Sequence, residues 1–278
     1  MAFAGEVGNG YAIMFEAYRK IYEGKGLQKI EIYETRFGKM LVIDGCIQLL
    51  EAFEHTYHEM LVHVPMITHS SPEKVLIIGG GDGGALREVL KHEPDRVVMV
   101  EIDREVVEVC RKFIGIDDGA FEDERVELRI EDGIEFVRRC AKEGEKFDVL
   151  IVDGTDPSPT SMSLFSREFY TLCSKISDVF CTQSQSPALQ PMEFRAVMRN
   201  ADVFERRAVY TSCIPMYPGG LWSFLIAGKV RLRIGEDELK RRFRRIKGKV
   251  KHYNPSLHIS AFSLPGWMRK LMPVQPVF

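Results

Sequence analysis

Residues 75–84, VLIIGGGDGG, decide the fold of this chain. The apolar first half predicts a buried strand, and the glycine-rich second half predicts a tight turn into a helix that begins near Ala85. Gly79, Gly81 and Gly84 satisfy the spacing GxGxxG, in which glycines let the backbone approach a ligand at a helix N-terminus. Taken alone the motif is weak, because a tight strand–helix turn without a ligand has the same pattern.

Strands and helices alternate with short connections after this motif. The predicted strands are 97–101, 126–130 and 148–152, and the predicted helices between them are 104–113 and 134–142. This alternation is typical of an α/β fold with a doubly wound, mostly parallel sheet, which we expect to be Rossmann-like.

A smaller β unit precedes the α/β region. Residues 28–50 alternate apolar and polar side chains and contain turn signals, which predicts a hairpin or meander, whereas residues 54–68 have the apolar spacing of an amphipathic helix. We therefore expect an N-terminal β-strand domain over 1–52 and a Rossmann-like domain over 53–278.

The composition of the 278-residue chain is that of an ordinary globular protein. Lys and Arg number 38 against 40 Asp and Glu, which gives a net charge of −2. Six scattered cysteines without a CxxC pair indicate free thiols in a reducing compartment, so a cytoplasmic location is expected. Neither a secretory signal nor a membrane span is expected. His58-Glu59 suggests a zinc helix, but the next histidine, His63, is at i+5, so no metal site is predicted.

Two acidic residues near the glycine motif narrow the choice of ligand. Asp82 places a carboxylate where a dinucleotide would bring its pyrophosphate, and two anions there repel each other. The loop therefore favours a nucleoside sulfonium compound over NAD. Glu101 ends the next strand about 20 residues on, where a carboxylate would hold ribose hydroxyls.

Further carboxylates follow the third and fourth predicted strands. Asp132-Gly133 would lie at the ligand-binding edge of the sheet, where Asp132 can accept a hydrogen bond from an adenine amino group or cap the next helix. Asp153 and Asp156 follow a buried strand three residues apart and should project into the same crevice. Together with Asp82 and Glu101 they would make four acids in one crevice, which indicates a polycationic substrate.

The tail carries eight basic residues between Lys240 and Lys251. Nucleic-acid binding is one interpretation. Leu239, Phe243 and Ile246 recur at helical spacing, however, so we favour a helix docked on its apolar stripe with a solvated basic face.

Several long motifs resemble the spermidine synthase family of polyamine aminopropyltransferases. They are GGGDGGALREVLKH, VEIDREV, EDGIEF, DVLIVDGTDP followed by SLFSREFY, IPMYPGGLWSF and YNPSLHISAFSLP, in the family's order from about Gly26 to the end. The resemblance implies a Rossmann-like domain with an N-terminal β domain, in a homodimer or homotetramer. It also implies transfer of an aminopropyl group from decarboxylated S-adenosylmethionine to an amine, with release of methylthioadenosine. The donor is a co-substrate, and no recycled cofactor is expected.

The resemblance also assigns roles to individual residues. The positions that match the family's donor site, together with the glycines of the motif, are Gln28, His58, Gly79, Gly81, Asp82, Glu101, Asp132 and Gly133. Asp153 matches the proton acceptor, and Tyr57, Asp156 and Tyr217 match positions around the acceptor amine. A proton acceptor is needed because an alkylamine of pKa about 10.4 is only about 1 part in 2,500 neutral at pH 7. Tyr57 could assist Asp153 by hydrogen bonding.

Three departures from the family pattern concern the acceptor. Thr160 replaces a Pro, Gln185 replaces a Glu that could hold the far amine of putrescine, and Ala188 stands where a Trp is common. They predict a more open, less acidic acceptor pocket with Gln185 in its wall. Putrescine is the favoured acceptor, with cadaverine, agmatine or a triamine as alternatives. Two more distant alternatives are a methyltransferase and a non-catalytic, nucleic-acid-associated relative.

Overall fold

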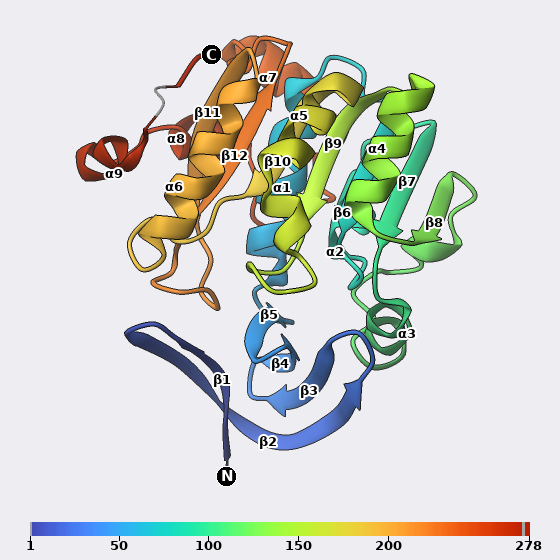
Figure 1. Cartoon of the computed structure of the whole chain (residues 1–278), viewed down its shortest axis with the longest axis vertical. Helices are drawn as coiled ribbons and strands as arrows, with labels where there is room; N and C mark the ends of the chain where they lie inside the picture. The colour runs from blue at the N-terminus through green and yellow to red at the C-terminus, as the bar shows by residue number, and fades with distance from the viewer. Residues whose placement is uncertain (1, 274–275) are drawn as a thin grey trace.

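The computed structural model describes residues 2–273 and 276–278, which form two sheets (Figure 1). The first is antiparallel, with strands in chain order. Its strands are β1 (Ala2–Gly8), β2 (Tyr11–Lys25), β3 (Lys29–Thr35), β4 (Gly38–Ile43) and β5 (Cys46–Leu50). The predicted meander over 28–50 corresponds to β3–β5, whereas β1 and β2 were not predicted from the sequence. Asn9-Gly10 between them is a hairpin signal, with Gly10 at φ 86°.

The second sheet has seven strands in the order β11-β12-β10-β9-β6-β7-β8. Its strands are β6 (Lys74–Gly79), β7 (Arg96–Glu101), β8 (Val126–Ile130), β9 (Phe147–Asp153), β10 (Ser177–Gln183), β11 (Arg206–Cys213) and β12 (Leu221–Gly228). Strands β6 to β10 are parallel, and β12 runs antiparallel to both of its neighbours. The Rossmann-like, doubly wound fold is thereby confirmed. The strand order reverses between β6 and β9, and such a reversal opens a crevice at the carboxyl ends of the strands.

Helices cover both faces of the large sheet, with α4, α5 and α6 on the near face and α1 and α2 behind it in Figure 1. The helices are α1 (Glu54–Thr68), α2 (Gly84–Leu90), α3 (Arg104–Phe113), α4 (Gly133–Glu143), α5 (Arg167–Ile176), α6 (Pro191–Asn200), α7 (Glu236–Phe243), α8 (Pro255–Ala261) and α9 (Gly266–Leu271). Helix α1 has the predicted bounds, but it is not amphipathic, because every residue except His55 is buried. Helix α3 packs instead on the N-terminal sheet, since Val106 and Val109 share a buried cluster with Ile30 and Leu41. That contact fixes the N-terminal sheet below the crevice.

Local signals in the sequence account for the helix ends beside the crevice. The Asp103 carboxylate accepts a hydrogen bond from the backbone N–H of Glu105 (2.9 Å) and caps α3. The Asp132 carboxylate does the same for α4 through Ile134 (2.9 Å), so its predicted capping role is confirmed. Each cap follows a parallel strand directly, which places its carboxylate at the ligand-binding edge.

The helix predicted for the basic segment is only partly correct. Helix α7 begins at Glu236 and ends at Phe243, and turns follow where the prediction extended the helix. Leu239 and Ile246 are nevertheless fully buried, so the apolar stripe docks as expected. Arg244 and Lys247 are exposed, which leaves a solvated basic face.

The six cysteines are free thiols, as the sequence predicted, and Cys110, Cys140, Cys173 and Cys181 are buried. Among the described residues, no helix is long and apolar enough to cross a membrane.

Candidate active site

A cavity lies in the crevice between β6 and β9 and extends to the N-terminal sheet. It encloses about 1030 Å³ including its open mouth. The sequence-predicted residues on its wall are Gln28, Tyr57, Gly79, Gly81, Asp82, Glu101, Asp132, Gly133, Asp153, Asp156 and Tyr217. His58 and Gln185 lie behind the wall. The structure therefore brings together four carboxylates predicted for one crevice, from Asp82, Glu101, Asp153 and Asp156.

The glycine turn after β6 allows close approach of the backbone. Gly79 has φ +83°, and a Cβ there would lie 2.2 Å from the carbonyl oxygen of Asp153. At Gly81, a Cβ would lie 2.8 Å from the Val106 side chain. Both positions exclude larger residues, and the turn can therefore present backbone to a ligand at short range.

Glu101 is held in a fixed orientation at the end of β7. Its carboxylate accepts hydrogen bonds from the backbone N–H of Gly81 (3.1 Å) and of Asp103 (3.0 Å). Burial raises the pKa of Glu101 to about 7, and these hydrogen bonds oppose the rise. The side chain lines the cavity and is suited to bind ligand hydroxyl groups.

Asp153 and Tyr57 form a hydrogen-bonded pair at the centre of the cavity. The Tyr57 hydroxyl donates to Oδ1 of Asp153 (2.9 Å). Burial and the Asp153 charge raise the pKa of Tyr57 well above its usual value, so Tyr57 is a neutral donor. Oδ2 of Asp153 is buried and has no hydrogen-bond partner among the described residues. Asp153 lines the cavity, and its unpartnered oxygen can accept a proton or a hydrogen bond from a ligand.

The acidity of Asp153 is set by its surroundings. Burial raises its pKa to about 6; the nearby His58 opposes this rise, while Asp82 adds to it. The group is therefore largely ionised near neutral pH, yet it is a stronger proton acceptor than an exposed aspartate.

His58 sits behind the glycine turn and faces carboxylates on both sides. Nδ1 lies 2.7 Å from Oε2 of Glu54, whereas Nε2 lies 3.5 Å from Asp82 and 3.9 Å from Asp153. Burial alone lowers the pKa of His58, but Asp82 and Glu54 raise it well above its usual value. A Cβ at Gly84 would lie 2.4 Å from the ring, so α2 packs directly on it.

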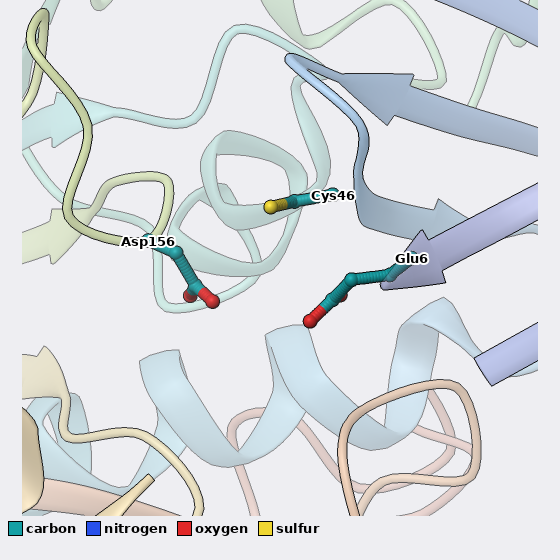
Figure 2. A group of neighbouring side chains, drawn as sticks. All are labelled: Glu6, Cys46 and Asp156. Atoms are coloured by element: carbon teal, nitrogen blue, oxygen red, sulfur yellow. The ribbon is translucent and has the colours of Figure 1, made fainter. Parts of the chain in front are cut away.

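A second acidic group lies at the other end of the cavity, where sequence reasoning placed only Asp156. Figure 2 shows Glu6 from β1, Cys46 at the start of β5 and Asp156 from the loop after β9 pointing toward one another. One carboxylate oxygen of Glu6, one of Asp156 and the sulfur of Cys46 lie within 4.8 Å of one another. Burial raises the pKa of both carboxyls, so a bound cation would stabilise their ionised forms. The sequence analysis did not predict Glu6 as a site residue because it did not predict β1. The Asn9-Gly10 turn was the sequence signal that could have indicated this strand.

The N-terminal sheet closes this end of the cavity. The Tyr217 hydroxyl donates to the backbone carbonyl of Gln48 (2.7 Å), and its ring packs edge-on against Tyr57 with centroids 5.3 Å apart. On the donor side, the side-chain amide of Gln28 donates to Asp44 (3.4 Å). Residues of the small sheet therefore bound the cavity at both of these places.

Gln185 does not reach the cavity surface. Its backbone lies in the left-handed region (φ 68°) just beyond the end of β10, and its side chain is fully buried. Burial raises the pKa of Asp156, and Gln190 and Gln185 oppose that rise, so Gln185 acts from behind Asp156. Thr160 lines the cavity, as its position in the family pattern implied, whereas Ala188 is exposed.

The strand order and the acidic crevice are those of a Rossmann-like fold of the S-adenosylmethionine-dependent transferase type. Residues 54–234 match the model of the spermine/spermidine synthase domain, and residues 3–51 match that of the spermidine synthase tetramerisation domain. The chain therefore belongs to the spermine/spermidine synthase family of polyamine aminopropyltransferases, which confirms the resemblance and extends it toward the N-terminus.

Individual relatives agree over nearly the whole chain. The polyamine aminopropyltransferase of Archaeoglobus fulgidus is 55% identical over 97% of this chain and 98% of its own length. That of Pyrococcus abyssi is 41% identical over 95% and 96%. A solved spermidine synthase in complex with the transition-state analogue AdoDATO has a TM-score of 0.90 and 35% identity, covering 97% of this chain and 94% of that one. The spermidine synthase from Thermotoga maritima gives 0.89 and 35%, with 97% and 93% covered.

Proposed function

We propose that this aminopropyltransferase is a spermidine synthase, which uses decarboxylated S-adenosylmethionine and putrescine. The observation that carries the proposal is the buried, unpartnered Oδ2 of Asp153, which lies between two groups of carboxylates in one cavity. One group borders the glycine turn and suits the donor. The other contains Glu6 and Asp156 and suits a second ammonium group.

The crevice fits the nucleoside part of the donor. Glu101 is oriented to accept hydrogen bonds from ribose hydroxyls, and Asp132 and Gly133 line the cavity beside it for the adenine. Gln28 also lines this part of the cavity. The decarboxylated donor ends in an ammonium group instead of a carboxylate, and Asp82 favours that cation.

The reaction requires an uncharged nitrogen on the acceptor. At pH 7 the amine is protonated, and freeing its lone pair by deprotonation costs about 4.6 kcal/mol. Asp153 takes the proton through Oδ2 while Tyr57 holds Oδ1. The nitrogen then forms a bond to the methylene carbon next to the sulfonium, the carbon–sulfur bond breaks, and its electron pair leaves with methylthioadenosine. Alignment of nitrogen, carbon and sulfur supplies much of the rate enhancement.

The far end of the cavity supports a diamine acceptor. The sequence predicted a less acidic pocket because position 185 carries no carboxylate, but Glu6 from the N-terminal sheet adds one beside Asp156. The prediction of a less acidic pocket is therefore wrong, because β1 supplies a carboxylate that position 185 lacks. We propose that Glu6 and Asp156 hold the ammonium group of putrescine that does not react.

We further propose that the chain forms a homo-oligomer in the cytoplasm. The N-terminal sheet exposes Phe3, Val7, Met14 and Tyr18, and large exposed apolar side chains grouped on one hairpin are typical of an interface. The match to a tetramerisation domain over the same strands favours a tetramer over a dimer. The free cysteines favour a reducing compartment.

A competition assay tests the proposed substrate. The enzyme receives decarboxylated S-adenosylmethionine with equal amounts of putrescine, cadaverine, agmatine and spermidine, and mass spectrometry follows methylthioadenosine and each product. Spermidine as the dominant product supports the proposal. Another dominant product keeps the chemistry and rejects putrescine. Salt-sensitive retention of nucleic acid with no methylthioadenosine from any amine would favour the non-catalytic alternative.

A further inference from the structure

Glu54, which is buried, and Arg87, which is partly buried, form an ion pair behind the cavity wall, and neither residue lines the cavity. Nη2 of Arg87 donates to both carboxylate oxygens of Glu54, at 3.1 and 2.9 Å. Nη1 donates to the carbonyl of Ile116 (2.7 Å) and Nε to Glu88 (2.8 Å). The guanidinium is therefore fixed by α2 and by the loop after α3, and it holds Glu54 in one orientation.

Glu54 in turn fixes the protonation of His58. The ring has a carboxylate oxygen near each nitrogen: Glu54 at Nδ1, and Asp82 and Asp153 at Nε2. An ionised carboxylate only accepts hydrogen bonds, so Nδ1 must carry a proton to donate to Glu54. The negative charges of Asp82 and Asp153 near Nε2 favour a second proton on that nitrogen. The His58 side chain is 2% exposed and that of Glu54 is 4% exposed, which keeps water from replacing either partner.

We propose that Glu54 and Arg87 are positioning residues that keep His58 doubly protonated, so that Asp153 stays ionised and ready to receive the proton of the acceptor amine. The proposal deepens the function given above and rests on the role of Asp153 there. It gives a role in the reaction to two residues that do not line the cavity.

The direction of the effect follows from where one proton resides. Nε2 of His58 and Oδ2 of Asp153 are 3.9 Å apart. In the first arrangement the proton is on the imidazole and Asp153 is ionised; in the second the proton is on Asp153 and the imidazole is neutral. Glu54 contacts Nδ1 of the ring, whereas Asp153 lies near Nε2 on the other side. The negative charge of Glu54 therefore stabilises a proton on the imidazole more than a proton on Asp153, which favours the first arrangement. The charged or titratable groups that face this pair are Glu54 and Tyr57 on α1, Asp82 after β6, Arg87 on α2 through Glu54, and Tyr217 before β12.

The variant Glu54→Gln keeps the shape of the side chain and removes its charge. We expect kcat/KM for putrescine to fall about tenfold relative to wild type at pH 6.5 and to approach the wild-type value near pH 9, because an opposite charge at this range shifts a titration by about one unit or more. The titration of the amine itself cancels in the ratio of variant to wild type. A ratio that does not change with pH would overturn the proposal.

Glu59→Gln is the matched control. Glu59 lies on the same helix and is equally buried, but its carboxylate accepts from the backbone N–H groups of Lys251, His252 and Tyr253 instead of contacting His58. Its variant should alter the rate by the same factor at every pH. A pH-dependent ratio for Glu59→Gln equal to that of Glu54→Gln would mean that general loosening of α1 explains both, and would reject the specific role of Glu54.

A measurement on the wild type does not depend on any variant that fails to fold. The imidazole nitrogen shifts of His58, assigned through His58→Gln, should remain those of an imidazolium from pH 6 to about 9. A neutral ring at pH 7.5 would overturn the proposal. Turnover of Asp153→Asn separates the two ideas: an active Asp153→Asn variant rejects the proposed base, whereas an inactive one combined with a flat Glu54→Gln ratio rejects only the role of Glu54 and Arg87.

Discussion

The two ends of the cavity are built in different ways. The donor end and the central Asp153 are made by residues that end a parallel strand or come just after one, namely Gly79, Glu101, Asp132 and Asp153. The acceptor end joins Glu6, Cys46 and Asp156, which come from β1, β5 and the loop after β9.

This difference separates chemistry from specificity. Carboxyl ends of adjacent parallel strands must meet at one edge of a sheet, so the donor end is a consequence of the fold itself. The acceptor end exists only because a second sheet docks against the first through α3 and Tyr217. Changes in the N-terminal sheet can therefore alter the choice of amine while leaving proton acceptance at Asp153 intact.

The largest effect is expected at Asp153, in the centre of the cavity. Asp153→Asn removes the proton acceptor and should lower kcat about 10³-fold, while the affinity for the donor changes less than about threefold. Methylthioadenosine release and calorimetric titration of the donor measure the two quantities. Asp148→Asn, at the opposite end of β9, is the control and should keep its turnover. Undiminished turnover in Asp153→Asn would remove this residue from the mechanism.

The same substitution should stabilise the fold in a pH-dependent way. The folded pKa of Asp153, about 6, is above the ordinary value of 3.8, so stability from this group is present at low pH and is lost as the pH rises toward 6. Above pH 6 the melting temperature of Asp153→Asn should therefore exceed that of wild type by roughly 2–6 °C, and the two should converge near pH 4. Scanning calorimetry of the ligand-free proteins at pH 4 and 7.5 decides it; equal melting temperatures at pH 7.5 would contradict the buried-charge argument.

A smaller effect is expected at the acceptor end. Glu6→Gln removes one of the two carboxylates proposed to hold the second ammonium group, which should raise KM for putrescine about tenfold. The donor affinity and kcat should change less than about twofold, since Glu6 is far from the reacting nitrogen. Glu23→Gln, an exposed carboxylate of the same sheet, is the control. A fall in kcat with unchanged KM would mean that Glu6 acts in the chemical step. It would contradict the idea that the acceptor end determines only the choice of amine.

The smallest effect is expected outside both ends. Arg244→Gln with Lys247→Gln neutralises two exposed side chains of the basic segment and should change turnover less than about twofold and stability less than about 0.5 kcal/mol. Steady-state kinetics and thermal melting check this. If the double variant lost activity, the basic segment would belong to the functional surface.

The sequence by itself determined the alternating strands and helices, the bounds of α1 and the carboxylates at the strand ends. These features depend on local signals, namely apolar periodicity, glycine turns and capping residues, and on the rule that parallel strands share an edge. The sequence also carried the hairpin signal Asn9-Gly10, but without a partner sheet it could not assign Glu6 to a site.

Only the tertiary structure decided which side chains meet across long separations. Glu6 joins Asp156 across about 150 residues of chain, Gln185 is turned behind Asp156 by a left-handed backbone position, and His58 gains Glu54 on one side and Asp82 on the other. Burial then raises the pKa of Asp153, because its charge is removed from water beside these neighbours. Such shifts depend on distance and solvent exclusion in three dimensions, which no local pattern of residues encodes.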